Sequence, residues 1–296
     1  MISEMDSLLL IGLLAILGLM FGSFAGAQVW RLRARQLIED TREGEPVDTK
    51  EYDALLPLTK NTLSSDRSQC LHCAETLAWF DLVPLISWLS TNGTCRYCKK
   101  SIGKFEPLME LGTASAFLVS YILWPLPLDG TKGVMLFILW LVALVLLAIL
   151  FAYDFKWFLL PDSIMFPLIG LGIIFSVLRI AGSENILFAL LSLGSAILVL
   201  SGLYYLLWLF SQGQWVGFGD VKLGLALALF IGEWQIALLA LFLANLIGTL
   251  VVVPGMLLGK IGRKAHVPFG PLLIAGMFTA MLIGERLLSL YLVTMF

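Results

Sequence analysis

The stretch GVMLFILWLVALVLLAILFAY, residues 133–153, runs for 21 residues without one charged side chain. An α-helix rises about 1.5 Å per residue, so a segment of this length crosses the roughly 30 Å hydrocarbon core of a bilayer. The rest of the chain has the same character, since 59% of its 296 residues are hydrophobic and only 14% are charged. Soluble domains are more polar. The sequence therefore predicts an all-α, polytopic membrane protein.

Apolar segments of this kind recur along the chain, and we expect about eight transmembrane helices. They are predicted at residues 7–30, 107–125, 133–153, 163–180, 185–210, 221–232, 235–258 and 268–286. The segment 221–232 is about three turns long. It is too short to cross alone unless the bilayer thins or water enters beside it.

The distribution of Lys and Arg predicts the orientation of these spans. If the N-terminus lies outside, 16 of the 19 basic residues fall on the cytoplasmic side. The outside then carries only Lys132, Arg179 and Arg286. Basic residues in short connections favour the cytoplasm, so both termini are expected outside, with the spans surrounded by membrane lipid.

This topology divides the chain into three regions. Residues 1–30 form the first transmembrane helix, 31–106 a cytoplasmic insertion and 107–296 a seven-helix membrane domain. The insertion contains eleven basic and eleven acidic residues, a balance that argues against a nucleic-acid partner. Its polar, turn-rich stretch EDTREGEPVDTKEYD, residues 39–53, is expected to be a loop.

All four cysteines lie in that insertion, in the motifs CLHC (Cys70 and Cys73) and CRYC (Cys95 and Cys98). Two such motifs place four thiolates around one ion, and zinc is the metal that favours this arrangement. With four protein ligands the site would be closed and structural. Redox-active thiols and cysteines without metal remain alternatives, and His72 is a possible replacement ligand.

Three aspartates abut the predicted cytoplasmic ends of the later spans. Asp154 follows the third span, Asp162 closes the sequence LPD, and Asp220 precedes the short sixth span in GFGD. Acidic residues at membrane depth usually mark a functional site. Two close carboxylates share a proton, so that one acts as a base on water while the other donates a hydrogen bond.

Helix capping is the competing explanation for these aspartates. It is the better explanation for Asp162 and is open for Asp220. It fails for Asp154, because an anion at the C-terminal end of a helix opposes the helix dipole. A transporter with acids inside the membrane is the rival class of function, and a structural membrane protein with a zinc knob is another.

Six blocks of sequence, in order, resemble the type IV prepilin peptidases, which are bifunctional leader peptidases and N-methyltransferases of bacterial inner membranes. The cysteine motifs are one block. The others are FGSFAGAQVWRLR (21–33), SIGKFEPLMELGTA (101–114), DFKWFLLPD (154–162), GFGDVK (217–222) and HVPFGP (266–271). Gly26 stands where the family usually has Asn, and Phe105-Glu106 replaces its Arg-Tyr pair.

The resemblance implies a membrane aspartic endopeptidase that removes the leader of type IV prepilins or pseudopilins after a glycine, at the cytoplasmic face. By position, Asp154 and Asp220 match its catalytic aspartates, and Asp162 does not. The family then methylates the new N-terminal residue from S-adenosyl-L-methionine. Both departures lie in the half associated with methyl transfer, so a peptidase without methyltransferase activity is the alternative. The residues that hold the methyl donor are unknown from sequence.

Overall fold

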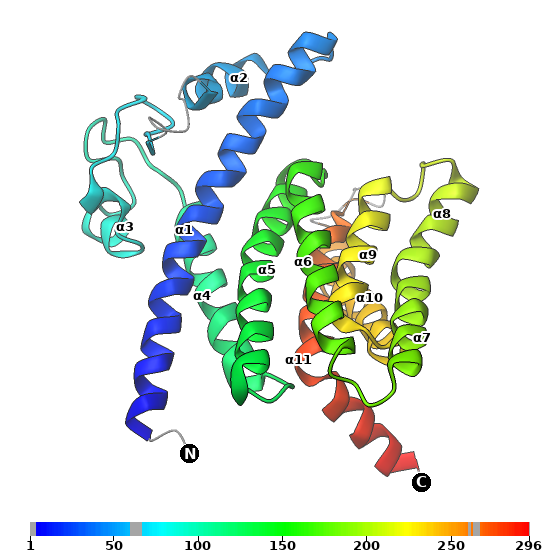
Figure 1. Ribbon diagram of the computed structural model, residues 1–296. Coiled ribbons are helices and arrows are strands. Elements are labelled where there is room, and N and C mark those ends of the chain that lie inside the picture. Colours follow the sequence, from blue (N-terminus) through cyan, green and yellow to red (C-terminus); the bar gives the residue numbers. More distant parts are fainter. Residues whose placement is uncertain (1–3, 60–66, 260–261, 263–266, 296) are drawn as a thin grey trace. The chain divides into compact units, whose positions relative to one another are not determined.

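The structure, a computed structural model, describes residues 4–59, 67–259, 262 and 267–295. These residues are largely helical, and among them pairing between extended segments is limited to two isolated β-bridges. The chain divides into two compact units, Met1–Tyr121 and Ile122–Phe296. The all-helical prediction is confirmed for the described part of the chain (Figure 1).

Unit 1 is built on two long helices, α1 (Glu4–Glu43) and α4 (Phe105–Leu123), which lie side by side in Figure 1. Two glycines of α1 face the backbone of α4. A β-carbon on Gly18 would lie 2.5 Å from Ala114 Cα, and one on Gly22 would lie 2.6 Å from Glu110 Cα. Small residues four apart let membrane helices approach closely, which explains why glycine occupies these two positions.

The stretch 39–53 is not the loop that the sequence predicted. Helix α1 continues to Glu43, and a second helix, α2, covers Thr49–Leu55. A small core of Ala34, Leu37 and Leu55 explains the difference, because it buries apolar side chains that are spaced at helical intervals along α1. Asp48 begins α2 by accepting the N–H groups of Lys50 and Glu51.

The segment between α2 and α4 contains short elements. They are η1 (Leu56–Thr59), η2 (Trp79–Leu82) and α3 (Ile86–Ser90). The two β-bridges, Gln69 with Thr76 and Thr94 with Ser101, close one tight loop around each cysteine motif. Within residues 67–104, the described part of this segment around the cysteines, the chain forms short turns rather than a larger sheet or helix.

Unit 2 is a helical bundle. Its helices are α5 (Gly130–Trp157), α6 (Asp162–Ile180), α7 (Ile186–Ile197), the π-helix η3 (Leu198–Gly202), α8 (Leu203–Ser211), α9 (Phe218–Ile231), α10 (Trp234–Leu257) and α11 (Phe269–Met295). Six helices of the described residues are long and apolar enough to cross a membrane. They are α1, α5, α6, the continuous segment Ile186–Ser211, α10 and α11.

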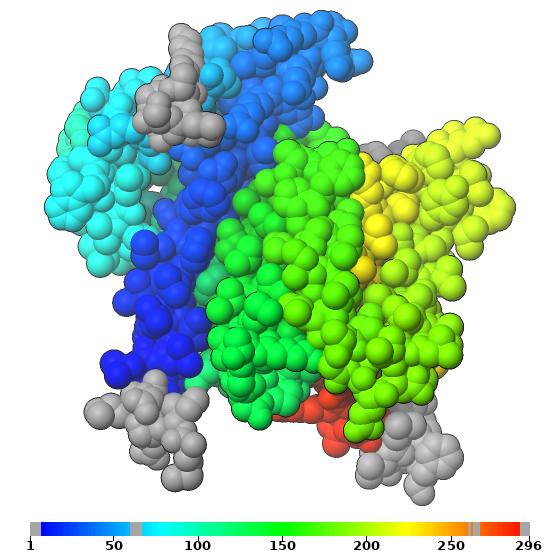
Figure 2. Space-filling model, viewed as in Figure 1, coloured from blue at the N-terminus to red at the C-terminus, as the bar shows by residue number. Residues whose placement is uncertain are grey.

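The short helix α9 occupies the centre of this bundle. It contacts α6, α7, η3, α8, α10 and α11, and nine of its 14 residues are buried. In the face shown in Figure 2 it is visible only as a yellow strip between α6 and α8. A helix that is apolar all round is expected where protein surrounds it, so α9 need not match the bilayer thickness.

Helix α6 holds the C-terminal end of α9. Ser176 Oγ donates to the Leu229 carbonyl at 2.6 Å, and Arg179 Nη1 donates to the Ile231 carbonyl at 2.6 Å. Arg179 also pairs with Glu233 at 3.2 Å. A cation at this position satisfies carbonyls that have no partner within the helix and opposes the negative end of its dipole. The position of α9 along the bundle is fixed in this way.

Candidate active site and cysteine cluster

Asp154 lies in the last turn of α5 and is 6% exposed. Its Oδ2 atom accepts the backbone N–H of Gly270, in the first turn of α11, at 3.0 Å. A β-carbon on residue 270 would lie 2.7 Å from the same oxygen, so only glycine lets the amide approach this closely. The positive N-terminal end of α11 thus compensates the anion that the C-terminal end of α5 disfavours.

Asp220 lies in the first turn of α9, three residues after the N-cap Gly217. Its carboxylate lies beside Gly217, where a β-carbon would be 3.8 Å from Asp220 Oδ2. An acid in the first turn complements the helix dipole, so part of the capping explanation applies to Asp220. The flanking Gly219 lies close to Leu160, where a β-carbon would come within 3.2 Å of the leucine side chain.

The fold brings Asp154 and Asp220 into electrostatic range of each other, although 65 residues separate them in the chain. The pair lies where the C-terminal end of α5 meets the N-terminal ends of α9 and α11. The buried side chain of Tyr204, on α8, is also within electrostatic range of Asp220, and its ring packs 5.5 Å from the ring of Phe269. Two acids and a phenol therefore converge at one end of unit 2.

Asp162 has a different environment. It is the first residue of α6, where its charge complements the helix dipole, but Pro161 is the N-cap and no side-chain cap is formed. The expectation of a hydrogen-bonded cap is therefore wrong. Asp162 instead forms an ion pair with Lys222, whose ammonium lies 5.5 Å from the ring centres of Phe166 and Phe218.

The sequence did not point to Gly270 or Tyr204 as site residues. Gly270 belongs to the HVPFGP block, so the block itself was the available signal. Its role depends on a contact between α11 and α5, made by two residues that are 116 positions apart in the sequence. Tyr204 lies in an apolar run with no distinguishing pattern, and nothing in the sequence separates it from its neighbours.

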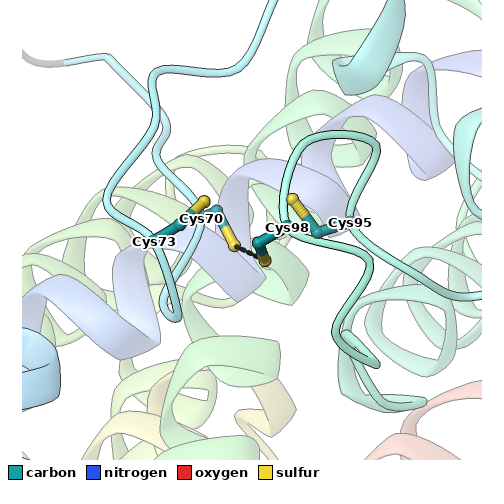
Figure 3. A group of neighbouring side chains, drawn as sticks. All are labelled: Cys70, Cys73, Cys95 and Cys98. Atoms are coloured by element: carbon teal, nitrogen blue, oxygen red, sulfur yellow. Dashed lines mark hydrogen bonds between the residues drawn. The ribbon is translucent and has the colours of Figure 1, made fainter.

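The four cysteines form a cluster in unit 1, with all four sulfur atoms within 4.8 Å of one another. They project from two loops that face each other, and the sulfur atoms of Cys70 and Cys98 are 3.9 Å apart (Figure 3). Four thiolates bound to zinc at about 2.3 Å in a tetrahedron lie about 3.8 Å from each other. The donor set therefore fits a tetrahedral metal site.

The two cysteine loops repeat the same backbone design. Cys70 N–H donates to the Glu75 carbonyl at 3.0 Å, and Cys95 N–H donates to the Lys100 carbonyl at 2.8 Å. Ala74 and Lys99 occupy equivalent positions with φ of 55° and 58°. Each loop turns its backbone N–H groups toward its first cysteine, an arrangement that holds thiolates beside a metal.

The thiols of the two loops differ in acidity. Burial raises the pKa of Cys70 to about 12. Burial also acts on Cys95, but the backbone N–H groups of Cys98 and Tyr97, together with the Cys70 and Cys98 thiols, outweigh it and lower the pKa of Cys95 to about 7. His72 Nε2 lies 3.1 Å from the Ser101 carbonyl, so its ring is engaged outside the four-sulfur cluster.

The fold and these two sites define a class of protein: a multi-pass membrane protein with a converging pair of acids in its helical bundle and a four-cysteine cluster near its first helix. Residues 16–124 match the model of the bacterial peptidase A24 N-terminal domain, and residues 141–253 match that of the type IV leader peptidase family. The chain belongs to the type IV leader peptidase family, as its resemblance in sequence predicted.

Curated relatives cover almost the whole chain. A prepilin leader peptidase/N-methyltransferase of Stutzerimonas stutzeri is 31% identical over 94% of this chain and 92% of its own length. A protein of the same name from Aeromonas hydrophila is 30% identical over 95% of this chain and 93% of its own length. Another, from Pectobacterium carotovorum subsp. carotovorum, is 32% identical over 93% of this chain and 94% of its own length. No solved structure matches the chain. These relatives do not favour a transporter.

Proposed function

We propose that this protein is a membrane aspartic endopeptidase that cleaves the leader from type IV prepilins or pseudopilins after a glycine and then N-methylates the new terminus. The observation that carries the peptidase activity is the convergence of Asp154 and Asp220 at one end of unit 2. The names of the relatives, which state both activities, support the assignment to this chain.

Asp154 and Asp220 act as a pair that holds one proton between them. The ionised member takes a proton from water, and the protonated member donates a hydrogen bond to the scissile carbonyl. The water oxygen bonds to the carbonyl carbon. The carbon–nitrogen bond then breaks as the leaving amine takes a proton from the pair, which returns to its starting state. The N–H of Gly270 positions Asp154 for this cycle.

Residues in unit 1 complete the proposal. Cys70, Cys73, Cys95 and Cys98 hold one structural zinc ion, which ties the two loops together. Bound S-adenosyl-L-methionine would supply the methyl group for the free α-amine of the cleaved substrate, leaving S-adenosylhomocysteine and a proton.

The proposed topology has eight spans, with both termini outside and the acids facing the cytoplasm. Helices α4 and α9 supply the two spans beyond the six that length and composition identify. Helix α9 is surrounded by other helices, which is why it crosses with only 14 residues. The bias of Lys and Arg supports the orientation. On this topology the substrate's apolar helix lies in the bilayer beside unit 2.

Cleavage of a prepilin by the purified full-length protein tests the peptidase assignment. Asp154→Asn and Asp220→Asn keep the side-chain shape but end proton exchange, so each abolishes cleavage. Because the two act as one unit, the double variant is hardly worse than either single variant. Asp162→Asn is the matched control and retains most activity. Loss of cleavage in Asp162→Asn, with cleavage retained in Asp154→Asn, refutes the assignment.

A further inference from the structure

The segment formed by η3 and α8 packs against α9, which carries Asp220 in its first turn (Figure 1). Ser201 Oγ donates to the carbonyl of Val221, the residue after Asp220, at 2.9 Å. Tyr204 follows about one helical turn later and is only 5% exposed, so it also lies on the side of the segment that faces α9. Its phenol is within electrostatic range of Asp220. The proton exchange of the two aspartates does not itself use this tyrosine.

The backbone before Tyr204 is a π-helical turn. Hydrogen bonds in a π-helix join residues five apart, which widens the turn and rotates the side chains that follow it relative to a continuous α-helix. The wider turn touches α9 directly, since a β-carbon on Gly224 would lie 2.6 Å from the Leu200 carbonyl oxygen. The first buried side chain beyond the turn is that of Tyr204. Turns of this kind occur frequently at functional sites, and this one directs a phenol toward an acid.

Tyr204 lies beside the second acid of the pair as well. Its ring packs against that of Phe269, with centres 5.5 Å apart. The next residue, Gly270, donates its N–H to Asp154 Oδ2 at 3.0 Å. Within the described part of the chain the Tyr204 hydroxyl has no hydrogen-bond partner, whereas a buried tyrosine usually has one. The hydroxyl is therefore a donor that can bind a group brought to the two acids.

The peptidase reaction needs such a donor. The oxygen of a peptide carbonyl has two lone pairs, and it gains negative charge as water adds to the carbon. The pair of aspartates holds one proton and so supplies one hydrogen bond to this oxygen. The Gly270 N–H cannot supply the second, because it is bound to Asp154. A phenol O–H that reaches the same oxygen satisfies the remaining lone pair.

We propose that Tyr204 is a third catalytic residue of the peptidase, whose hydroxyl donates a hydrogen bond to the scissile carbonyl oxygen. The inference deepens the proposed function and rests on it. As the water oxygen bonds to the carbonyl carbon, an electron pair moves onto the carbonyl oxygen, and the Tyr204 O–H and the protonated aspartate stabilise its charge. When the carbon–nitrogen bond breaks, the electron pair returns to the carbonyl. Tyr204 keeps its own proton throughout.

Tyr204→Phe removes the hydroxyl and keeps the ring against Phe269. One donor to a developing oxyanion contributes roughly 10²–10³ in kcat, so we expect kcat for cleavage of a purified prepilin by the full-length protein to fall by about 10²-fold. KM should stay within about threefold of wild type, because the charge that the hydroxyl stabilises develops only in the transition state. A normal kcat would overturn the proposal, and so would a raised KM with an unchanged kcat.

The pH dependence of kcat/KM separates this role from a hydrogen bond to Asp220. The two limbs of the profile report the titration of the aspartate pair. A hydroxyl that binds the substrate oxygen leaves both limbs in place, so Tyr204→Phe should lower the whole profile and keep each limb within about 0.3 pH units of wild type. Displacement of a limb by about one unit or more would show that Tyr204 positions the proton of the pair and does not bind the substrate.

Stability provides a second readout. Because the hydroxyl has no partner in the described part of the chain, Tyr204→Phe should unfold at the same or a slightly higher temperature. A variant that is destabilised or fails to fold would assign the hydroxyl a structural role instead. 4-Aminophenylalanine at position 204 restores a donor on the same ring and should recover kcat to within about tenfold of wild type. No recovery relative to Tyr204→Phe would count against the hydrogen bond.

Tyr205→Phe is the matched control. Tyr205 is the next residue of α8, is exposed, and stacks on Trp208 with ring centres 6.0 Å apart. This variant should cleave within about twofold of wild type, and a loss like that of Tyr204→Phe would show that the effect is not specific to position 204. If the two aspartate variants are inactive while Tyr204→Phe is normal, the peptidase function stands without this contact. If wild type cleaves no prepilin, both fail.

Discussion

Gly270→Ala should impair cleavage without altering either aspartate. A β-carbon at this position would lie 2.7 Å from Asp154 Oδ2, whereas ordinary contacts begin near 3.4 Å. Relief of this contact requires a movement of about 0.7 Å. The 3.0 Å hydrogen bond from the Gly270 N–H to the carboxylate then lengthens, and the carboxylate moves relative to Asp220.

The size of the effect follows from the precision that the dyad requires. A misplacement near 1 Å costs roughly 10²-fold in rate, or about 2.7 kcal/mol of transition-state stabilisation. We therefore expect kcat/KM for a purified prepilin to fall by about 10²-fold. Methylation of an already cleaved substrate should be unchanged, because unit 2 is not proposed to perform it.

Gly170→Ala is the matched control. Gly170 lies inside α6 of the same unit, and a β-carbon there meets nothing within 4 Å. This variant should cleave within about twofold of wild type and unfold at the same or a slightly higher temperature, because alanine favours helix. Near-normal kcat/KM in Gly270→Ala would show that the placement of Asp154 does not depend on this contact.

Three further predictions concern the rest of the fold. Any single Cys→Ser change at Cys70, Cys73, Cys95 or Cys98 should lower zinc content and the stability of unit 1, and elemental analysis that finds no zinc in protein purified without chelator would contradict the metal site. Arg179→Met should lower the free energy of unfolding by about 1–3 kcal/mol in a denaturant titration, because it leaves two carbonyls of α9 without their donor; an unchanged midpoint would exclude that role. Cysteines placed near Gly182 and Gly262 should be labelled from opposite sides of the membrane, and labelling from one side would reject the topology.

Composition was sufficient to predict the helical architecture. Helices lie at the positions of all eight predicted segments, because long apolar runs must satisfy their backbone groups internally in a membrane. The helical extension of α1 past residue 30 was missed. Its apolar residues are few, and their burial depends on Leu55, which returns from later in the chain.

The candidate site was predictable only in part. The cysteine spacing indicated a cluster, and the structure places all four sulfur atoms together. For the acids, the conflict between Asp154 and the helix dipole was visible in the sequence, but its resolution by α11 was not. That contact and the approach of Tyr204 to Asp220 arise from the packing of distant helices, which local sequence patterns do not encode.

The shortness of α9 sets a length scale for the substrate. Fourteen residues of helix extend about 21 Å, whereas the hydrocarbon core measures about 30 Å. On the proposed topology, with the C-terminal end of α9 at the outer boundary of this core, the helix begins about 9 Å inside the cytoplasmic boundary, and Asp220, two residues further along, lies about 12 Å inside it. An extended chain covers that depth in about four residues. The enzyme would therefore read how many uncharged residues separate the last charge of a leader from the bond to be cut.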